Sequence, residues 1–91
     1  MFSLESVPKP HPQVVSRLVD DEAVLVLPHT GKVKVLNKVG GRIWELSDGK
    51  RSVKEIACII HQEYKVTLEV AEADTLAFLK ELAERDMFQD D

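Results

Sequence analysis

The chain has 91 residues, of which 44% are hydrophobic and 31% charged, and its formal net charge is −4. This length allows one domain with a small core. The sequence has no apolar run of about eighteen residues and no basic start followed by an apolar stretch, so it predicts neither a membrane-spanning helix nor a secretory signal. A single cysteine, Cys58, excludes a scaffold held by internal disulfides, and we expect a cytoplasmic protein.

The charge is unevenly distributed. Residues 67–91 hold eight acidic and two basic side chains, whereas residues 1–66 carry a small positive excess. A negative protein is poorly suited to broad electrostatic binding of nucleic acid. Two interpretations of the acidic segment stay open: a solvated helix, or a surface that selects a partly basic partner.

The first elements in chain order are an arm and three strands. Pro8, Pro10 and Pro12 favour an extended arm over residues 1–13, because proline disfavours helix at and before its own position. Runs rich in β-branched and apolar residues then predict strands, separated by turn signals at 20–21 and 28–31. The predicted strands span residues 14–19, 22–27 and 32–36. Their order suggests an antiparallel meander.

The third predicted strand, Lys32 to Leu36, alternates strictly between polar and apolar residues. Such alternation predicts one wet face and one dry face. We expect Val35 to contribute to the core, and Lys32 and Lys34 to lie near the rim. In a three-stranded meander two strands are edges, and an exposed edge invites pairing with another strand.

Three helices follow, and each begins at a good cap. Asn37 precedes the first, Ser52 and Glu55 form a capping box before the second, and Thr67 precedes the third. The first helix should end at Asp48-Gly49 and the second near Tyr64. The predicted buried stripes are Val39, Ile43 and Leu46; then Val53, Ile56, Ala57, Ile60 and Tyr64; then Leu68, Ala71, Thr75, Phe78, Leu79 and Leu82.

Gly40 and Gly41 are unusual inside a helix, where each glycine costs roughly 1 kcal/mol relative to alanine. We expect this turn to lie close to another backbone. Strands followed by helices indicate an α+β domain, a three-stranded antiparallel sheet followed by three helices in a winged helix-turn-helix-like arrangement. The domain should cover residues 14–88, with a frayed tail at 89–91.

No set of residues indicates catalysis or a metal site. Cys58 and His61 lie three residues apart on one helix, but two ligands do not make a closed site. We expect Cys58 to pack as a small hydrophobic residue and His61 to be solvated. No nucleophile has a matching base and orienting group. The sequence therefore predicts a protein without enzyme activity, metal or cofactor.

A winged helix can also bind nucleic acid. Lys50, Arg51, Lys54 and Lys65 form a thin basic patch around the second helix, but the third helix presents mostly acidic residues where a recognition helix needs Arg, Lys, Asn or Gln. A nucleic-acid-binding regulator is therefore the alternative function. A structural subunit that forms a homodimer through its sheet edge is a third possibility.

The remaining class is peptide binding. Val70, Ala73 and Ala77 lie off the buried stripe of the third helix at i, i+3 and i+7 and form a small apolar strip. This strip is either ordinary helix surface or the floor on which a peptide or a second subunit lies. Trp44, at the border of its helix's stripe, is either half-buried core or a binding anchor.

Several short motifs, in this order and spacing, resemble one family. They are Leu36-Asn37, Gly41, Ile43-Trp44, Leu46, Asp48-Gly49, Ser52-Val53 and Glu55-Ile56, followed by Asp74, Phe78-Leu79 and Leu82. The pattern resembles that of pyrroloquinoline quinone biosynthesis protein D (PqqD) over about residues 8–88. Two positions depart from it: Leu76 is one position from the usual valine, and Asp86 stands where the family commonly has glycine. The second departure puts the end of the third helix in question.

The resemblance implies a peptide-recognition domain that binds the leader of a ribosomally made precursor peptide. Such a domain presents the leader to a modifying enzyme, often a radical S-adenosylmethionine enzyme, and performs no catalysis itself. The leader would pair as an extra strand with the third strand, in a groove walled by the third helix. The expected contact residues are Lys32, Val33, Lys34, Val35 and Leu36 on the strand, and Val70, Ala73, Ala77 and Lys80 on the helix. The lysines of both elements are candidates to meet leader carboxylates.

Overall fold

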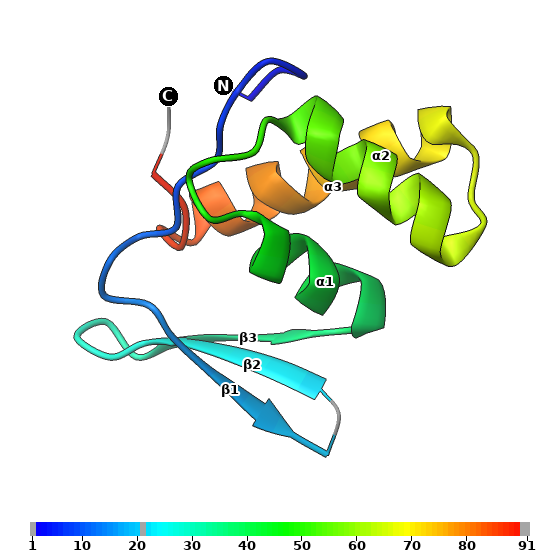
Figure 1. Ribbon diagram of the computed structural model, residues 1–91. Helices are drawn as coiled ribbons and strands as arrows, with labels where there is room; N and C mark the ends of the chain where they lie inside the picture. The colour runs from blue at the N-terminus through cyan, green and yellow to red at the C-terminus, as the bar shows by residue number, and fades with distance from the viewer. Residues whose placement is uncertain (1, 21, 90–91) are drawn as a thin grey trace.

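A computed structural model describes residues 2–20 and 22–89, and it forms three strands followed by three helices. The elements are β1 (Val15–Val19), β2 (Glu22–Leu27), β3 (Lys32–Leu36), α1 (Lys38–Leu46), α2 (Val53–Tyr64) and α3 (Leu68–Glu84). The strands pair antiparallel in the order β1-β2-β3, and the helices lie together on one face of the sheet (Figure 1). The predicted α+β class and element order are confirmed.

The predicted helix caps are all present. The side chain of Asn37 accepts a hydrogen bond from the backbone N–H of Gly40, and that of Thr67 accepts one from Val70. Ser52 and Glu55 bond reciprocally to each other's backbone N–H groups and complete the capping box. These bonds satisfy N–H groups that have no partner inside a helix, so each helix starts where its local sequence specifies.

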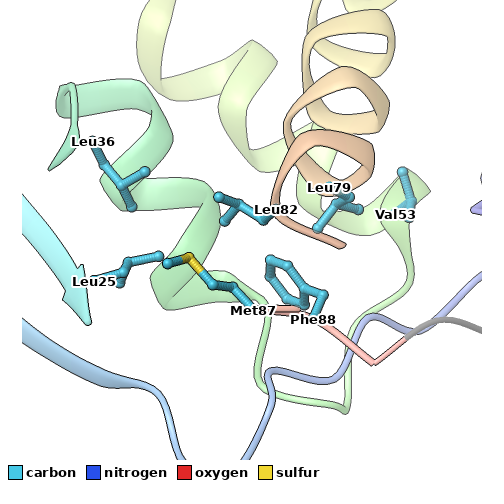
Figure 2. Close-up of a cluster of buried hydrophobic side chains, with 7 residues drawn as sticks. All are labelled: Leu25, Leu36, Val53, Leu79, Leu82, Met87 and Phe88. Carbon is cyan, nitrogen blue, oxygen red and sulfur yellow. The ribbon is translucent and has the colours of Figure 1, made fainter. Parts of the chain in front are cut away.

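Two groups of buried side chains form the core. The first lies between the sheet, α3 and the C-terminal segment (Figure 2), and it consists of Leu25, Leu36, Val53, Leu79, Leu82, Met87 and Phe88. The second lies among the helices and consists of Ile43, Leu46, Ile56, Ala57, Ile60 and Ala71. Half-buried Phe78 of α3 packs against both groups, so it links the helical layer to the sheet.

The first turn of α1 lies close to side chains of α3 and β3. A Cβ atom added to Gly40 would lie 3.1 Å from Cε1 of Phe78 and 3.6 Å from Cβ of Leu36. The predicted close approach is therefore present, but the neighbours are side chains and not another backbone. Glycine allows Phe78 to settle over the junction between β3 and α1.

The structure shows how α3 ends at Asp86, which stands where the family commonly has glycine. Asp86 has φ of 62°, in the left-handed region that glycine adopts most easily. The backbone N–H of Met87 donates to the carbonyl of Leu82 at 2.9 Å, and that of Asp86 donates to Ala83 at 3.0 Å. These two bonds are the Schellman pattern. The helix therefore ends in the usual way, with aspartate in the position that favours glycine.

The N-terminal arm has turns at residues 4–5 and 12–13 and packs against the helices. The carbonyls of Leu4 and Ser6 accept hydrogen bonds from Lys54 and Val53, at 2.9 and 2.8 Å. These donors are the first two residues of α2, whose N–H groups have no partner within the helix. The arm therefore completes the capping of α2, and Pro8 becomes buried beside it.

The arm also joins the C-terminal segment. Pro10 forms an antiparallel bridge with Phe88, and the backbone N–H of Gln89 donates to the carbonyl of Lys9 at 2.9 Å. Phe2 meets Phe88 edge to face, with ring centroids 6.3 Å apart. Of the tail predicted at 89–91, Gln89 is therefore held, while residues 90–91 lie outside the described residues, as does residue 21 of the predicted turn at 20–21.

Two burial predictions for the helices were wrong. Leu68, placed in the buried stripe of α3, is 37% exposed because it is the first residue of the helix and lies beyond its packed middle. Cys58 is exposed and does not pack as a small hydrophobic residue. The buried residues of α2 on either side of it are Ala57 and Ile60, and a residue directly after Ala57 is turned about 100° away from it.

Candidate functional site

The strand β3 forms one edge of the sheet, because β2 is its only neighbour in the described sheet. Lys32, Lys34 and Leu36 lie on the face that carries the helices, opposite Leu27, Leu25 and Ala23 of β2. Val33 and Val35 lie on the other face, each 51% exposed. The backbone groups on the outer side of β3 are consequently available to a further strand.

This arrangement reverses the expected faces of β3. Val35 was expected in the core, but it points away from the helices, and the lysines lie on the helix side. The cause is Leu36, which enters the core and is only 2% exposed. Because side chains alternate along a strand, burying Leu36 places Lys34 and Lys32 on the same face. The lysines tolerate this position because their long stems carry the charge to the rim.

Both lysines form ion pairs with the C-terminal half of α3 and the residues just beyond it. Lys34 Nζ lies 3.0 Å from Glu81 Oε1, and Lys32 Nζ lies 2.7 Å from Asp86 Oδ2. The hydrogen bond and positive charge of Lys32 hold the pKa of Asp86 below its ordinary value. These contacts place the end of α3 beside β3, and they give the lysines partners within the chain.

Glu81 shows which side of α3 faces the outer edge of β3. Residues four, seven and eleven positions before it lie on the same side of the helix, and these are Ala77, Asp74 and Val70. Val70 and Ala77 are both exposed. Val70 and Ala77 are the apolar members of this stripe, and Asp74 and Glu81 are its acidic members. Among the expected contact residues, Val70 and Ala77 therefore lie on the side of α3 that carries Glu81, the partner of Lys34.

Ala73 and Lys80 lie further round the helix. Both are exposed, and they project roughly opposite to the buried residues Ala71, Thr75 and Leu82. The structure therefore divides the predicted helix residues, all four of them exposed, into a pair on the side of Glu81 and a pair further round the helix. Sequence periodicity identified all four as outside the core, but it could not say which side of α3 meets the strand.

A groove that the sequence did not indicate lies between β1 and α1. It has a volume of about 470 Å³, and its lining includes Leu18, Gly41, Trp44 and Tyr64. Leu18, which lines this groove, is 75% exposed. Trp44 is half-buried and meets Phe88 with ring centroids 5.1 Å apart, so of its two interpretations the structure shows the half-buried core position.

Arg42, which lines this groove, forms an ion pair. Arg42 donates two hydrogen bonds of 2.9 Å to the two carboxylate oxygens of Glu63, which joins α1 to α2. This bond raises the pKa of Arg42 and lowers that of Glu63. Bidentate pairing orients the guanidinium, so Arg42 is held toward α2.

Other kinds of site have little support in the described part of the chain. Within residues 2–20 and 22–89, no three His, Cys, Asp or Glu side chains gather as metal ligands would. No helix there is long and apolar enough to cross a membrane. In the basic patch considered for nucleic acid, Arg51 is already bonded to Asp48 at 2.8 Å.

Comparison with known proteins adds a family and a fold. The sequence model of coenzyme PQQ synthesis protein D (PqqD) matches residues 22–87. The structure of TbiB1 in complex with the TbiA(beta) leader peptide is 37% identical, with a TM-score of 0.81, over 89% of this chain and 94% of that one. The comparison with curated proteins found no match.

Two further solved structures are similar. The PqqD truncation of Methylobacterium extorquens PqqCD, a stand-alone recognition element for ribosomally synthesised and post-translationally modified peptides, is 28% identical. Its TM-score is 0.84, over 99% of this chain and 96% of that one. A lasso peptide synthetase B1 complexed with its leader peptide has a TM-score of 0.85 over 93% of this chain and 100% of that one, and at 24% identity it supports the fold alone.

Proposed function

Because this chain belongs to the family of coenzyme PQQ synthesis protein D (PqqD), we propose that it binds the leader of a ribosomally synthesised precursor peptide and presents it to a modifying enzyme. The observation that carries the proposal is the free edge of β3 beside the stripe of α3 that contains Val70 and Ala77. The leader complex of TbiB1, similar over most of both chains, supports it. The protein would act by binding alone, without a catalytic step.

In the proposed complex the leader is an extended strand antiparallel or parallel to β3. Its backbone hydrogen-bonds to the outer side of β3, which supplies affinity that depends little on sequence. Alternate leader side chains turn toward the helices and meet Val70 and Ala77, which supplies specificity. The other side chains lie beside Val33 and Val35 on the opposite face of the sheet.

Charge has a secondary role in this binding mode. Lys32 and Lys34 already pair with Asp86 and Glu81, so a leader carboxylate would have to share or displace these partners. Exposed ion pairs contribute about 0–1 kcal/mol each to stability. Replacing Asp86 or Glu81 by a leader carboxylate would therefore change the free energy of binding little. Lys80 lies on the solvent side of α3, and it would meet only a leader segment that extends past the groove.

The receiving enzyme would be a radical S-adenosylmethionine enzyme, and the encounter would take place in the cytoplasm. The sequence resemblance supports the enzyme class. The exposed thiol of Cys58 supports a reducing compartment, because a free surface thiol is readily oxidised elsewhere.

The test is a titration of the isotope-labelled protein with a synthetic leader peptide, the TbiA(beta) leader bound by the similar TbiB1, followed by NMR. Amide signals of residues 32–36 and 70–81 should move together and saturate at the same peptide concentration. Signals of β1, at the opposite edge of the sheet, serve as the internal control and should stay in place. Shifts confined to residues 50–65, or to β1 and α1, would place the peptide elsewhere.

A further inference from the structure

The sheet face that points away from the helices is apolar and has no cover among the described residues (Figure 1). It carries the valine face, defined as Val15, Val19, Val24, Val26, Val33 and Val35. The four valines on the two edge strands are between 41% and 52% exposed, while the two on β2 are half-buried between them. Exposed apolar patches rimmed by polar residues, when they are large enough, mark interaction sites.

The pattern of β2 indicates that this face is covered in the working protein. A sheet with one solvated face alternates apolar and polar residues, whereas strands covered on both faces read as continuous apolar runs. From Ala23 to Leu27 every residue of β2 is apolar. Even β3 places its valines on the outer face and its lysines on the helix side. The pattern of β2 therefore predicts two covered faces for this strand, and the helices cover one of them.

The strand register places two opposite charges beside the central valine. Val24 lies at the middle of the face, paired with Arg17 on β1 and Val35 on β3. Glu22 lies on the same face, two residues before Val24 along β2. Arg17 is therefore the neighbour of Val24 across the strands, and Glu22 is its neighbour along the strand. The two directions are perpendicular.

This arrangement is complementary to itself. Its symmetry axis is a two-fold axis that lies in the plane of contact and runs diagonally across the sheet from Val19 through Val24 to Val33. Rotation about this axis brings the direction across the strands of one protomer onto the direction along the strands of the other. It places Arg17 of one protomer over Glu22 of the partner subunit, twice by symmetry. It also places Val26 over Val35 of the partner subunit, and the valines on the axis meet their own copies. The strands of the two sheets then cross steeply, as in orthogonal sheet packing.

We propose that two copies of this chain associate through their valine faces, with Arg17 of each opposite Glu22 of the partner subunit. Three strands of five residues present a flat area of roughly 240 Å². A standard interface buries about 800 Å² per partner, so this dimer is weak, with a dissociation constant of about 10 µM to 1 mM. The contact uses sheet faces, so both β3 edges stay open to a peptide strand.

The first experiment is sedimentation of the leader-free protein from about 10 µM to about 1 mM, a range that spans the expected dissociation constant. The wild-type protein should pass from monomer to dimer over this range. Val19→Lys places two lysines together at the axis and should weaken the dimer at least about tenfold. Leu68→Lys, at an exposed apolar position on α3, is the matched control and should leave the dissociation constant unchanged.

The second experiment tests the arrangement of the charges. Arg17→Glu alone and Glu22→Arg alone place like charges opposite each other and should each weaken the dimer. The double variant Arg17→Glu with Glu22→Arg restores opposite pairing, and its dissociation constant should return to within roughly threefold of wild type. These variants decide the question even if Val19→Lys fails to fold, which circular dichroism reports. A monomer at every concentration, an unchanged dissociation constant in Val19→Lys, or a double variant as weak as the single ones overturns the proposal.

Discussion

The two edges of the sheet have similar backbones but different surroundings. On the side of Glu81, α3 presents Val70 and Ala77 together with Asp74, and ion pairs of 2.7 and 3.0 Å join β3 to the end of the helical segment. All five residues of β1 are exposed, and beside it lies the open groove under α1. An edge alone offers only backbone hydrogen bonds, which any extended peptide can use. A wall beside the edge adds side-chain discrimination, and on this reasoning we assign the leader to β3.

Length and charge do not distinguish the two edges, because β1 and β3 each have five residues and each carries basic side chains. The edges differ in the side chains that lie beside them. The difference between the edges can be tested by weakening the wall, by blocking each edge in turn, and by changing the residues that hold α3 near β3.

The largest effect should come from removing the core contact that holds α3. Leu82→Ala empties a fully buried position and should lower the free energy of unfolding by about 2–5 kcal/mol, measured by urea titration. That is a large share of the stability of a domain of this size. Leu68→Ala, in the same helix but exposed, is the control and should cost far less. Similar losses for the two variants would show that α3 is not anchored as described.

The next effect concerns the choice between edges. Ala77→Arg puts a long charged side chain on the stripe of α3 that faces the β3 edge, and it should weaken leader binding by about tenfold or more. Leu18→Arg is the matched change at the β1 edge and should leave affinity unaltered. Ala73→Arg, further round α3, should give an intermediate loss. Isothermal calorimetry on folded variants checks the order, and a greater loss for Leu18→Arg would move the site to β1.

A smaller effect is expected at the end of α3. Asp86 holds a left-handed backbone conformation, so Asp86→Gly should relieve strain and raise the melting temperature by about 3 °C, even though the ion pair with Lys32 is lost. Asp86→Ala loses the same ion pair without gaining glycine's freedom, and it should melt below the wild type. Scanning calorimetry distinguishes them. Equal melting temperatures for the two variants would mean that backbone strain at this position is negligible.

The smallest effect should be a loss of stability in acid. Hydrogen bonds to Asp86, from Lys32, and to Glu63, from Arg42, lower the pKa of each carboxyl in the folded protein below its ordinary value of 3.8 or 4.5. The folded state therefore binds fewer protons than the unfolded state in this range. The contribution is complete above those ordinary values and is lost as the pH falls through the lower folded-state values. Both groups are exposed, so salt should reduce the effect.

A comparison of Arg42→Met with the wild type isolates one of these pairs. The variant lacks the partner of Glu63, so its melting temperature should fall less steeply between pH 5 and pH 3 than that of the wild type, a window of about one unit on each side of an ordinary carboxyl pKa. Parallel melting curves for the two proteins would show that this pair has no pH-dependent contribution.

The sequence by itself determined the order, type and starting points of the elements. Asn37, Ser52 with Glu55, and Thr67 bond to backbone groups within three residues of themselves, so their action needs no other part of the chain. The period of apolar residues likewise separates strands from helices over short distances. The family resemblance supplied the proposed binding edge, and the assignment of individual contact residues remains a prediction.

Only the tertiary structure decided which face of each element is covered. The alternation of β3 is compatible with either face of the strand pointing toward the helices. The burial of Leu36 and the ion pairs of the lysines determine which face does so. Glu81, the partner of Lys34, lies 47 residues away from it in the chain. The stripe of α3 that meets β3 and the groove beside β1 depend on contacts of the same kind. A local pattern indicates that an element has one polar face and one apolar face. Which face is buried depends on the free energy of packing between segments far apart in the chain, and that packing exists only after folding.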